Sequence, residues 1–165
     1  MKFIKLKRGD RQKITKNFSI DEWFTDHKLN PGKQEVSKSL IETLQVLRDY
    51  FGVPIRITSA YRSRPYQKFI KRRNIFAAEN SPHSYKIAVD FKFLKDNTAN
   101  VQKFHEEVEN KGKLWHILRK LGIGGFGLYD NFIHIDERPK NGFGNTSFTD
   151  EYGRYRIWDK RQKKK

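Results

Sequence analysis

One histidine and two aspartates stand where short β-strands would present them opposite an apolar face, and a second histidine lies close before one of these strands. In residues 87–93 apolar side chains form one face of an expected strand, and Asp90 lies on the other face. The same alternation in residues 132–136 puts His134 and Asp136 opposite an isoleucine face. His83 lies seven residues before Asp90, close enough for a turn to bring both side chains together. Two imidazoles and a carboxylate match a catalytic zinc site, in which the metal makes hydroxide available for attack on a carbonyl.

Spacing alone favours a plainer interpretation, because metal sites are a minority explanation for His and Asp pairs. On that interpretation Asp90 is a surface residue and both histidines are satisfied by ordinary hydrogen bonds. The sequence has no cysteine, which excludes disulfides, thiolate metal clusters and a cysteine nucleophile. Any metal ion must therefore be held by His, Asp or Glu.

The elements that would position these residues can be read from the apolar spacing. Ser19 and Glu22 have capping-box spacing, which predicts a short helix start in residues 18–24. The remaining predictions are an amphipathic helix over 35–51 ended by Gly52, a strand over 53–58, a helical or irregular basic stretch over 64–73, a strand over 87–93, one or two helices over 97–121 with an interruption near Gly112, and strands over 126–129 and 132–136. This order is not a regular βαβ alternation. We therefore expect a single α+β domain with a small, largely antiparallel sheet flanked by helices, and the zinc site on the sheet.

The formal charge of +16 is concentrated at the two ends of the 165-residue chain. Residues 1–16 contain seven bases and one acid, and residues 160–165 contain five bases, so the middle of the chain carries only +5. We divide the chain into a basic N-terminal arm (1–17), a domain (18–159) and a basic C-terminal tail (160–165). Tight nucleic-acid recognition is not expected, because no recognised binding motif accompanies the charge.

Four segments, in order, resemble the zinc D-alanyl-D-alanine peptidases of the M15 family. Residues 81–90 (SPHSYKIAVD) are similar to the family motif S-x-H-x-x-G-x-A-x-D, and residues 57–63 (ITSAYRS) to its S-G/A-Y-R-S segment. Residues 122–139 are similar to its G-I-G-x-Y and F-[IV]-H-[IV]-D-x-R-P ending, and residues 18–24 to its F-S-x-x-E-[FW] segment. The resemblance is to members of subfamily A of this family, including phage-encoded ones.

The resemblance implies a role for each matched residue. His83, Asp90 and His134 would be the zinc ligands, and Arg62 would bind a carboxylate or carbonyl of the substrate, unless it only forms a structural salt bridge. For the general base we favour Asp136, with Asp130 as the alternative. Asp136 could instead orient a ligand from behind.

Two positions depart from the family pattern. Asn131 stands three residues before the last histidine, where better-studied members have an acidic residue. Lys86 stands where the motif has glycine. If that glycine supplies a positive φ, lysine there costs roughly 1 kcal/mol. If it leaves room for substrate, Lys86 would block or recharge the cleft.

The glycines of residues 122–127 also fit a dinucleotide fingerprint, G-x-G-x-x-G. That fingerprint needs a strand before it and a helix after it. Here a helix is expected before it and strands after it, so we interpret these glycines as a tight helix-to-strand turn beside the site.

The function that follows from the resemblance is zinc-dependent hydrolysis of peptidoglycan stem peptides, as a D-Ala-D-Ala carboxypeptidase or a lysin-like endopeptidase. The alternative is a non-catalytic virion or cell-wall-binding component that retains the fold. Expected partners are the stem peptide, anionic wall polymers bound through the basic termini, and virion or tail proteins. No classical signal peptide is visible, so we expect a protein made in the cytoplasm that reaches the wall by lysis-linked release or on a virion.

Overall fold

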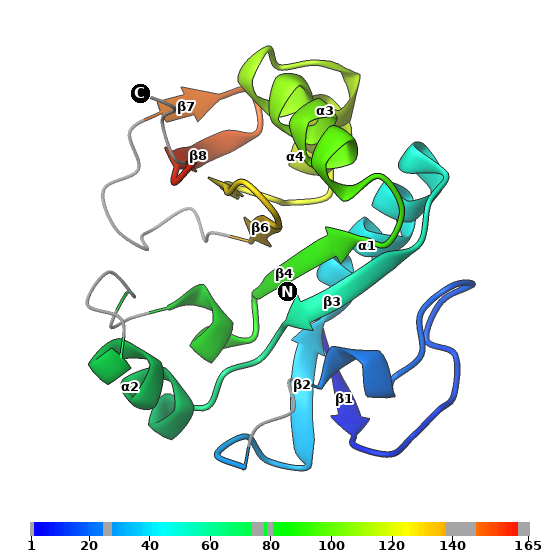
Figure 1. Cartoon of the computed structure of the whole chain (residues 1–165), viewed down its shortest axis with the longest axis vertical. Coiled ribbons are helices and arrows are strands. Elements are labelled where there is room, and N and C mark those ends of the chain that lie inside the picture. The colour runs from blue at the N-terminus through cyan, green and yellow to red at the C-terminus, as the bar shows by residue number, and fades with distance from the viewer. Residues whose placement is uncertain (1, 25–27, 74–77, 79–80, 138–147, 162–165) are drawn as a thin grey trace.

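The computed structural model describes residues 2–24, 28–73, 78, 81–137 and 148–161 (Figure 1). Its elements are β1 (Phe3–Lys7), the 3₁₀ helix η1 (Asp21–Trp23), β2 (Lys33–Ser37), α1 (Lys38–Phe51), β3 (Ile55–Ser59), α2 (Arg64–Arg73), the 3₁₀ helix η2 (Pro82–Tyr85), β4 (Ala88–Phe93), α3 (Asn97–Glu109), α4 (Lys113–Lys120), β5 (Gly125–Leu128), β6 (Ile133–Asp136), β7 (Phe148–Asp150) and β8 (Gly153–Asp159). No helix among the described residues has the length and apolar character needed to cross a membrane.

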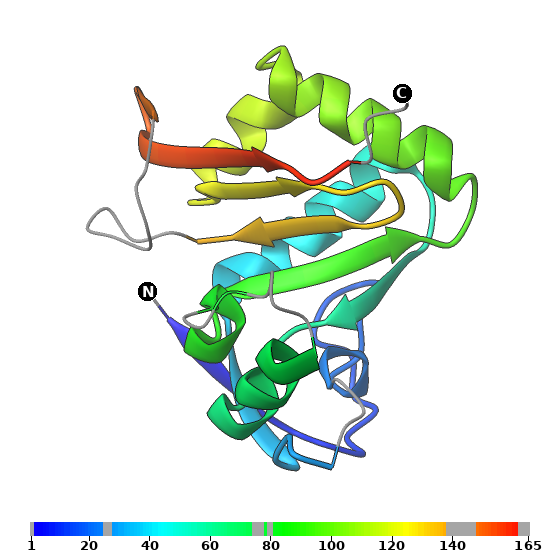
Figure 2. The same ribbon diagram turned by 60° about the vertical axis from the view of Figure 1, so that its left-hand side comes forward.

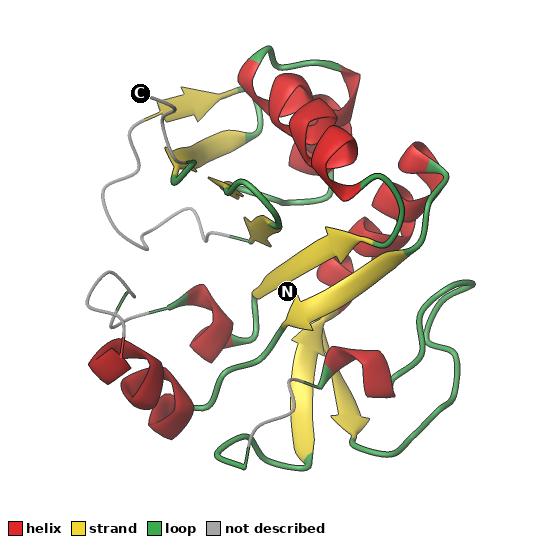
Figure 3. Ribbon diagram, viewed as in Figure 1, coloured by secondary structure: helices red, strands yellow, loops and turns green. Residues whose placement is uncertain are grey.

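The main sheet has six strands in the order β3-β4-β6-β5-β8-β7. Its pairs are antiparallel, except for the parallel pair that β5 forms with β8. The strands β1 and β2 form a separate antiparallel pair. Helices and strands are mixed along the chain, as Figure 3 shows. The predicted α+β fold with a largely antiparallel sheet is therefore confirmed.

One face of the main sheet and the helices α1, α3 and α4 share the hydrophobic core. Phe91 of β4, Ile135 of β6 and Phe126 of β5 are fully buried, and α1 runs behind these strands (Figure 2). The helix α1 buries its leucines at three- and four-residue spacing, and it ends at Gly52, whose φ of 66° forms a left-handed cap. The opposite face of the sheet is thus the one that can carry polar side chains.

The helix predictions hold with two refinements. Residues 97–121 form two helices, α3 and α4, with Gly112 as the N-cap of the second. The helix expected from residue 35 begins at Lys38, because residues 33–37 pair with β1 as a strand. Glu22 accepts a hydrogen bond from the Ser19 backbone N–H (2.8 Å), as capping-box spacing predicts, and it also accepts one from the Ser19 hydroxyl (2.7 Å).

The described parts of both basic termini make contacts with the rest of the fold. In β1, Ile4 and Leu6 alternate with lysines, so the strand turns apolar side chains inward, and Leu6 is buried. At the other end Arg161 pairs with Asp159 (2.7 Å) and Glu109 (2.6 Å). Residues 162–165 lie outside the described residues. The proposed domain boundaries stay a prediction, but residues 3–7 belong to the fold.

Candidate metal centre

A single row of residues crosses the sheet on its polar face. Its members are register partners from β3, β4, β6, β5 and β8: Ser59, Asp90, His134, Gly127 and Trp158. In the three central strands β4, β6 and β5, strand alternation sends the neighbours of each member into the core, which leaves this position on the outer face. Asp90 and His134 therefore sit side by side on adjacent strands, as their parity predicts.

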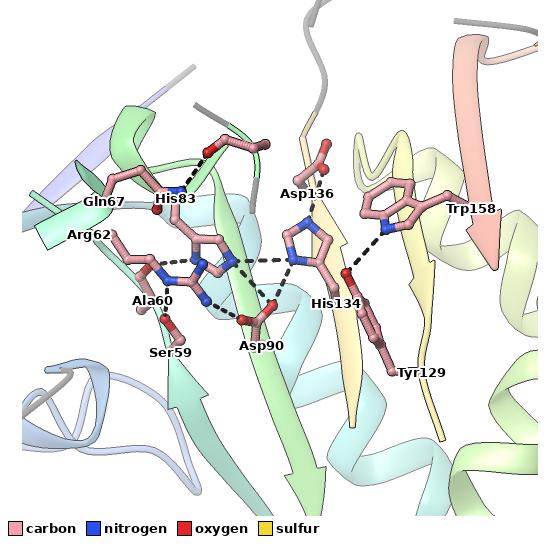
Figure 4. A network of polar contacts seen from close by, with 11 residues as sticks. Ser59, Ala60, Arg62, Gln67, His83, Asp90, Tyr129, His134, Asp136 and Trp158 are labelled. Atoms are coloured by element: carbon pink, nitrogen blue, oxygen red, sulfur yellow. Dashed lines mark hydrogen bonds and ion pairs between the residues drawn. The ribbon is translucent and has the colours of Figure 1, made fainter. Parts of the chain in front are cut away.

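His83 reaches the same point from η2, the short helix just before β4 (Figure 4). Its Nε2 lies 3.1 Å from Asp90 Oδ1 and 3.2 Å from His134 Nδ1. His134 Nδ1 lies 2.6 Å from the same Asp90 oxygen. All three residues are buried, and their ligand atoms lie within 4.8 Å of one another. Among the described residues, this is the one group of three or more His, Asp or Glu side chains that could hold a metal ion.

Hydrogen bonds on the outer edges of both imidazoles fix how the rings are turned. His83 Nδ1 donates to the carbonyl of Ala60 (2.6 Å), and His134 Nε2 donates to Asp136 Oδ2 (3.1 Å). These bonds leave His83 Nε2 and His134 Nδ1 as the atoms that face Asp90. Outer partners of this kind set the tautomer and basicity of ligating histidines. The donor set and its support thus fit a metal ion.

The protonation of the metal-free group follows from its surroundings. Burial lowers the pKa of His83 to about 4, and the charge of Arg62 acts in the same direction. Burial alone would also lower the pKa of His134, but hydrogen bonds to Asp136 and Asp90 raise it to about 9. Burial would raise the pKa of Asp90, yet the two histidines hold it well below its usual value. Without metal, the His134 ring therefore carries both of its protons and a positive charge at neutral pH, whereas the His83 ring is neutral and keeps only the proton on Nδ1.

Metal binding is consequently expected to release one proton, because a ligating His134 Nδ1 must lose the hydrogen that it donates to Asp90. Apparent zinc affinity should rise about tenfold per pH unit between about pH 6 and 9 and level off above pH 9. The raised pKa of His134 also stabilises the metal-free fold fully below the ordinary histidine pKa of 6.5, and this contribution is lost as pH rises through about 9. Chelator competition across this range tests the slope, and a flat affinity profile would contradict it.

Arg62, for which the sequence predicts a substrate-side role or a structural salt bridge, lies beside the group and shortly after β3. Its guanidinium donates to Asp90 Oδ2 (2.5 Å) and to the Ser59 hydroxyl (2.8 Å). Its backbone N–H donates to the carbonyl of His83 (3.3 Å). Arg62 thus holds the outer oxygen of Asp90, while the other oxygen faces the histidines.

The two predicted general bases lie in different places. The carboxylate of Asp136 is fully buried and contacts the edge of the His134 ring that points away from Asp90. Asp130 is exposed in the turn between β5 and β6, and Asn131 is exposed next to it. The geometry of Asp136 matches the orienting role considered for it. Which residue acts as base stays a prediction.

The structure separates the two explanations for Lys86. Its φ is 67° and its ψ is 20°, so this position does require the left-handed conformation that glycine adopts most easily. Its side chain extends to Glu35 on β2, with 2.7 Å between Nζ and Oε2. Lys86 therefore pairs with a carboxylate outside the metal group.

Four residues that support the site were not predicted to do so from the sequence. The ring of Trp158 packs against His134, with 5.1 Å between centroids, and its Nε1 donates to the hydroxyl of Tyr129 (3.3 Å). Gly127 leaves the space that these rings fill, since a Cβ there would lie 2.8 Å from Tyr129 and 2.9 Å from Trp158. A Cβ on Gly125 would overlap the Asp136 carboxylate. Of the expected turn glycines, Gly122 has a positive φ of 92°, whereas Gly125 and Gly127 lie within β5.

The class of protein follows from the number of protein ligands. Three protein ligands would leave a coordination position of a bound metal ion for a reactant, which is typical of a metal-dependent hydrolase and not of a structural metal site. The family model described as Peptidase M15 matches residues 16–136, which is most of the chain. The chain therefore belongs to the M15 peptidase family, whose members are metallopeptidases.

The matched range contains His83, Asp90, His134 and Arg62, but it ends before the strand that carries Trp158. No curated protein sequence matches the chain. Arg138 and Pro139 of the predicted family segment lie outside the described residues.

Proposed function

We propose that the protein is a zinc-dependent peptidase that hydrolyses peptidoglycan stem peptides, as a D-alanyl-D-alanine carboxypeptidase or a lysin-like endopeptidase. The observation that carries this proposal is the buried group of His83, Asp90 and His134 in a chain of the M15 family. Two imidazole nitrogens and a carboxylate oxygen suit zinc. When bound there, zinc would polarise a carbonyl group and lower the pKa of a water molecule.

The chain's own residues prepare the site for that chemistry. The Ala60 carbonyl and Asp136 hold the two imidazoles by their outer edges, so both rings present a nitrogen to the same point. Arg62 fixes the outer oxygen of Asp90. A guanidinium has further N–H donors in a planar fork, and these suit a carboxylate or carbonyl oxygen of a peptide substrate.

The test is mass spectrometry of muropeptides digested with zinc-loaded protein and with chelated protein. We expect cleavage within the stem peptide that depends on zinc, and the masses of the products name the bond. Intact muropeptides in the presence of stoichiometric zinc would contradict the proposal. That result would favour the second candidate, a virion or wall-binding component that retains the fold without turnover.

One structural observation supports the second candidate, a wall-binding component. Lys86 joins Glu35 beside a hollow of about 440 Å³ between the β1–β2 pair and the segments that carry Tyr61 and Lys86. Four lysines line this basic hollow, together with Asp10 and Glu35: Lys5, Lys7, Lys33 and Lys86. We propose that it attracts anionic wall polymers, whether or not the chain also cleaves peptides. Virion or tail proteins as partners, and delivery to the wall by lysis or on a virion, belong to the same proposal.

Charge removal at the basic hollow should weaken attachment to the wall and spare peptide cleavage. We expect the triple variant Lys5→Gln, Lys7→Gln and Lys33→Gln to bind isolated cell walls roughly tenfold less tightly at low salt, with the difference shrinking as salt rises. These side chains are exposed, so the substitutions leave the fold intact, whereas deleting residues 1–16 would remove β1. Wall co-sedimentation at several ionic strengths measures the effect.

The matched control removes the same charge from the other end of the molecule. Its three exposed positions are Lys95, Lys113 and Lys120. Equal loss of wall binding in both triple variants would show that net charge, and not the basic hollow, accounts for attachment.

A further inference from the structure

Tyr129 and Trp158 form an aromatic wall beside the metal group. Tyr129 follows β5 and stacks on Phe132, with 4.1 Å between ring centroids and 19° between ring planes. Trp158 reaches over the space left by Gly127 to the ring of His134. Figure 4 shows both rings on the side of His134 away from His83.

The hydrogen bond between the two rings has only one possible direction. An indole N–H can donate and cannot accept, so the Tyr129 oxygen is the acceptor of the 3.3 Å bond from Trp158 Nε1. The phenol hydrogen must then point elsewhere. Within the described part of the chain the Tyr129 hydroxyl makes no other hydrogen bond. Trp158 thus orients a donor whose hydrogen is left for a ligand.

The Tyr129 hydroxyl lies close enough to the metal group to be affected by its charges. Burial raises the pKa of Tyr129, and among the nearby charges Asp90 raises it while Arg62 lowers it. The hydroxyl is therefore protonated at neutral pH, and the charges of Asp90 and Arg62 both act on it. Arg62 approaches the group from β3 and Tyr129 from β5, two strands on opposite sides of β4 and β6.

We propose that Tyr129 contacts the substrate and donates its hydroxyl hydrogen to the scissile carbonyl oxygen, and that Trp158 is the positioning residue that aims it. This inference rests on the proposed peptidase function. A hydrogen bond aimed at an oxygen that gains negative charge during the reaction binds the transition state more tightly than the ground state. The positioning residue comes from β8, beyond the range matched by the family, so the C-terminal hairpin completes the site.

Tyr129→Phe is the direct test, because it removes the hydroxyl and keeps the ring that stacks on Phe132. The probe is the phosphinate analogue of D-alanyl-D-alanine, whose tetrahedral phosphorus replaces the scissile amide. We expect zinc-loaded Tyr129→Phe to bind it about 10- to 100-fold more weakly than wild type, with a similar fall in kcat/KM and unchanged zinc affinity. Tyr152→Phe, in the turn between β7 and β8, is the matched control and should behave as wild type.

Trp158→Phe separates aiming from packing, since it keeps an aromatic ring near His134 and removes the indole N–H. Its effect on analogue binding should be severalfold in the wild-type background and should vanish in the Tyr129→Phe background. Additive effects would overturn the aiming role of Trp158. Unchanged analogue affinity in Tyr129→Phe would overturn the inference while leaving the peptidase proposal intact. A zinc-loaded wild-type protein that binds neither this analogue nor the phosphinate analogue of any other stem-peptide bond would overturn both.

Discussion

His83→Ala is expected to abolish the thermal stabilisation that zinc gives to the wild-type protein, and to abolish peptide hydrolysis with it. A ligand present at 1,000 times its Kd stabilises the folded state by about 4 kcal/mol. For a domain of this size, each kcal/mol raises Tm by about 2–4 °C, so zinc should raise the wild-type Tm by roughly 10 °C. With His83 removed, two of the three buried ligands remain, and the shift should disappear.

The comparison is made within each variant, with and without zinc, because His83 is buried and its removal also leaves a cavity. The cavity lowers both Tm values of the variant and cancels in their difference. His116→Ala is the matched control, since His116 is exposed on α4 and lies outside the metal group. A zinc-dependent shift that survives in His83→Ala would show that zinc binds elsewhere.

The residues of the metal group could be predicted from the sequence because the patterns that place them lie within a few neighbouring residues. The alternation of apolar residues around Asp90 and His134 fixes which face of the strand each occupies, whatever the strands pair with. His83 is tied to Asp90 by a turn of a few residues. The family resemblance then selected these residues from the other histidines and aspartates of the chain.

The supporting residues depend on pairings between distant segments, which local patterns do not reveal. Trp158 reaches His134 only because β8 pairs in parallel with β5, about thirty residues earlier in the chain. Gly125 and Gly127 looked like turn residues. Their role in making room for the Asp136 carboxylate and the Trp158 ring depends on what lies across the sheet.

The strand β1 was not predicted from the sequence because lysines dominate the composition of the N-terminus. In residues 3–7 the inward positions hold Ile4 and Leu6, and lysines surround them, so the composition suggests a solvated arm. The period-2 pattern was present, but it is short, and its partner β2 lies in a segment whose residues 35–37 also fit the start of α1. Only the tertiary pairing decides between strand and helix there.

Gly125→Ala is expected to disturb the metal group through Asp136, although Gly125 itself is not one of the metal-binding residues. A Cβ at this position would overlap the carboxylate of Asp136, which is fully buried and bonded to His134. Because buried neighbours leave that carboxylate little room, we expect a loss of about 1–3 kcal/mol of stability. The displaced acceptor would also release the outer edge of His134, and loss of such a partner lowers metal affinity about 10- to 100-fold.

Gly32→Ala is the matched control, because a Cβ there meets nothing within 4 Å and its φ is not positive. Chelator competition and thermal unfolding of both variants measure the two effects. Asp136→Asn separates them further, since it keeps the volume and weakens the acceptor, so it should lose metal affinity with a smaller loss of Tm than Gly125→Ala. If Gly125→Ala unfolds at a lower temperature but binds zinc as tightly as wild type, then Asp136 does not hold His134 in its ligating orientation, and the bond between them is structural alone.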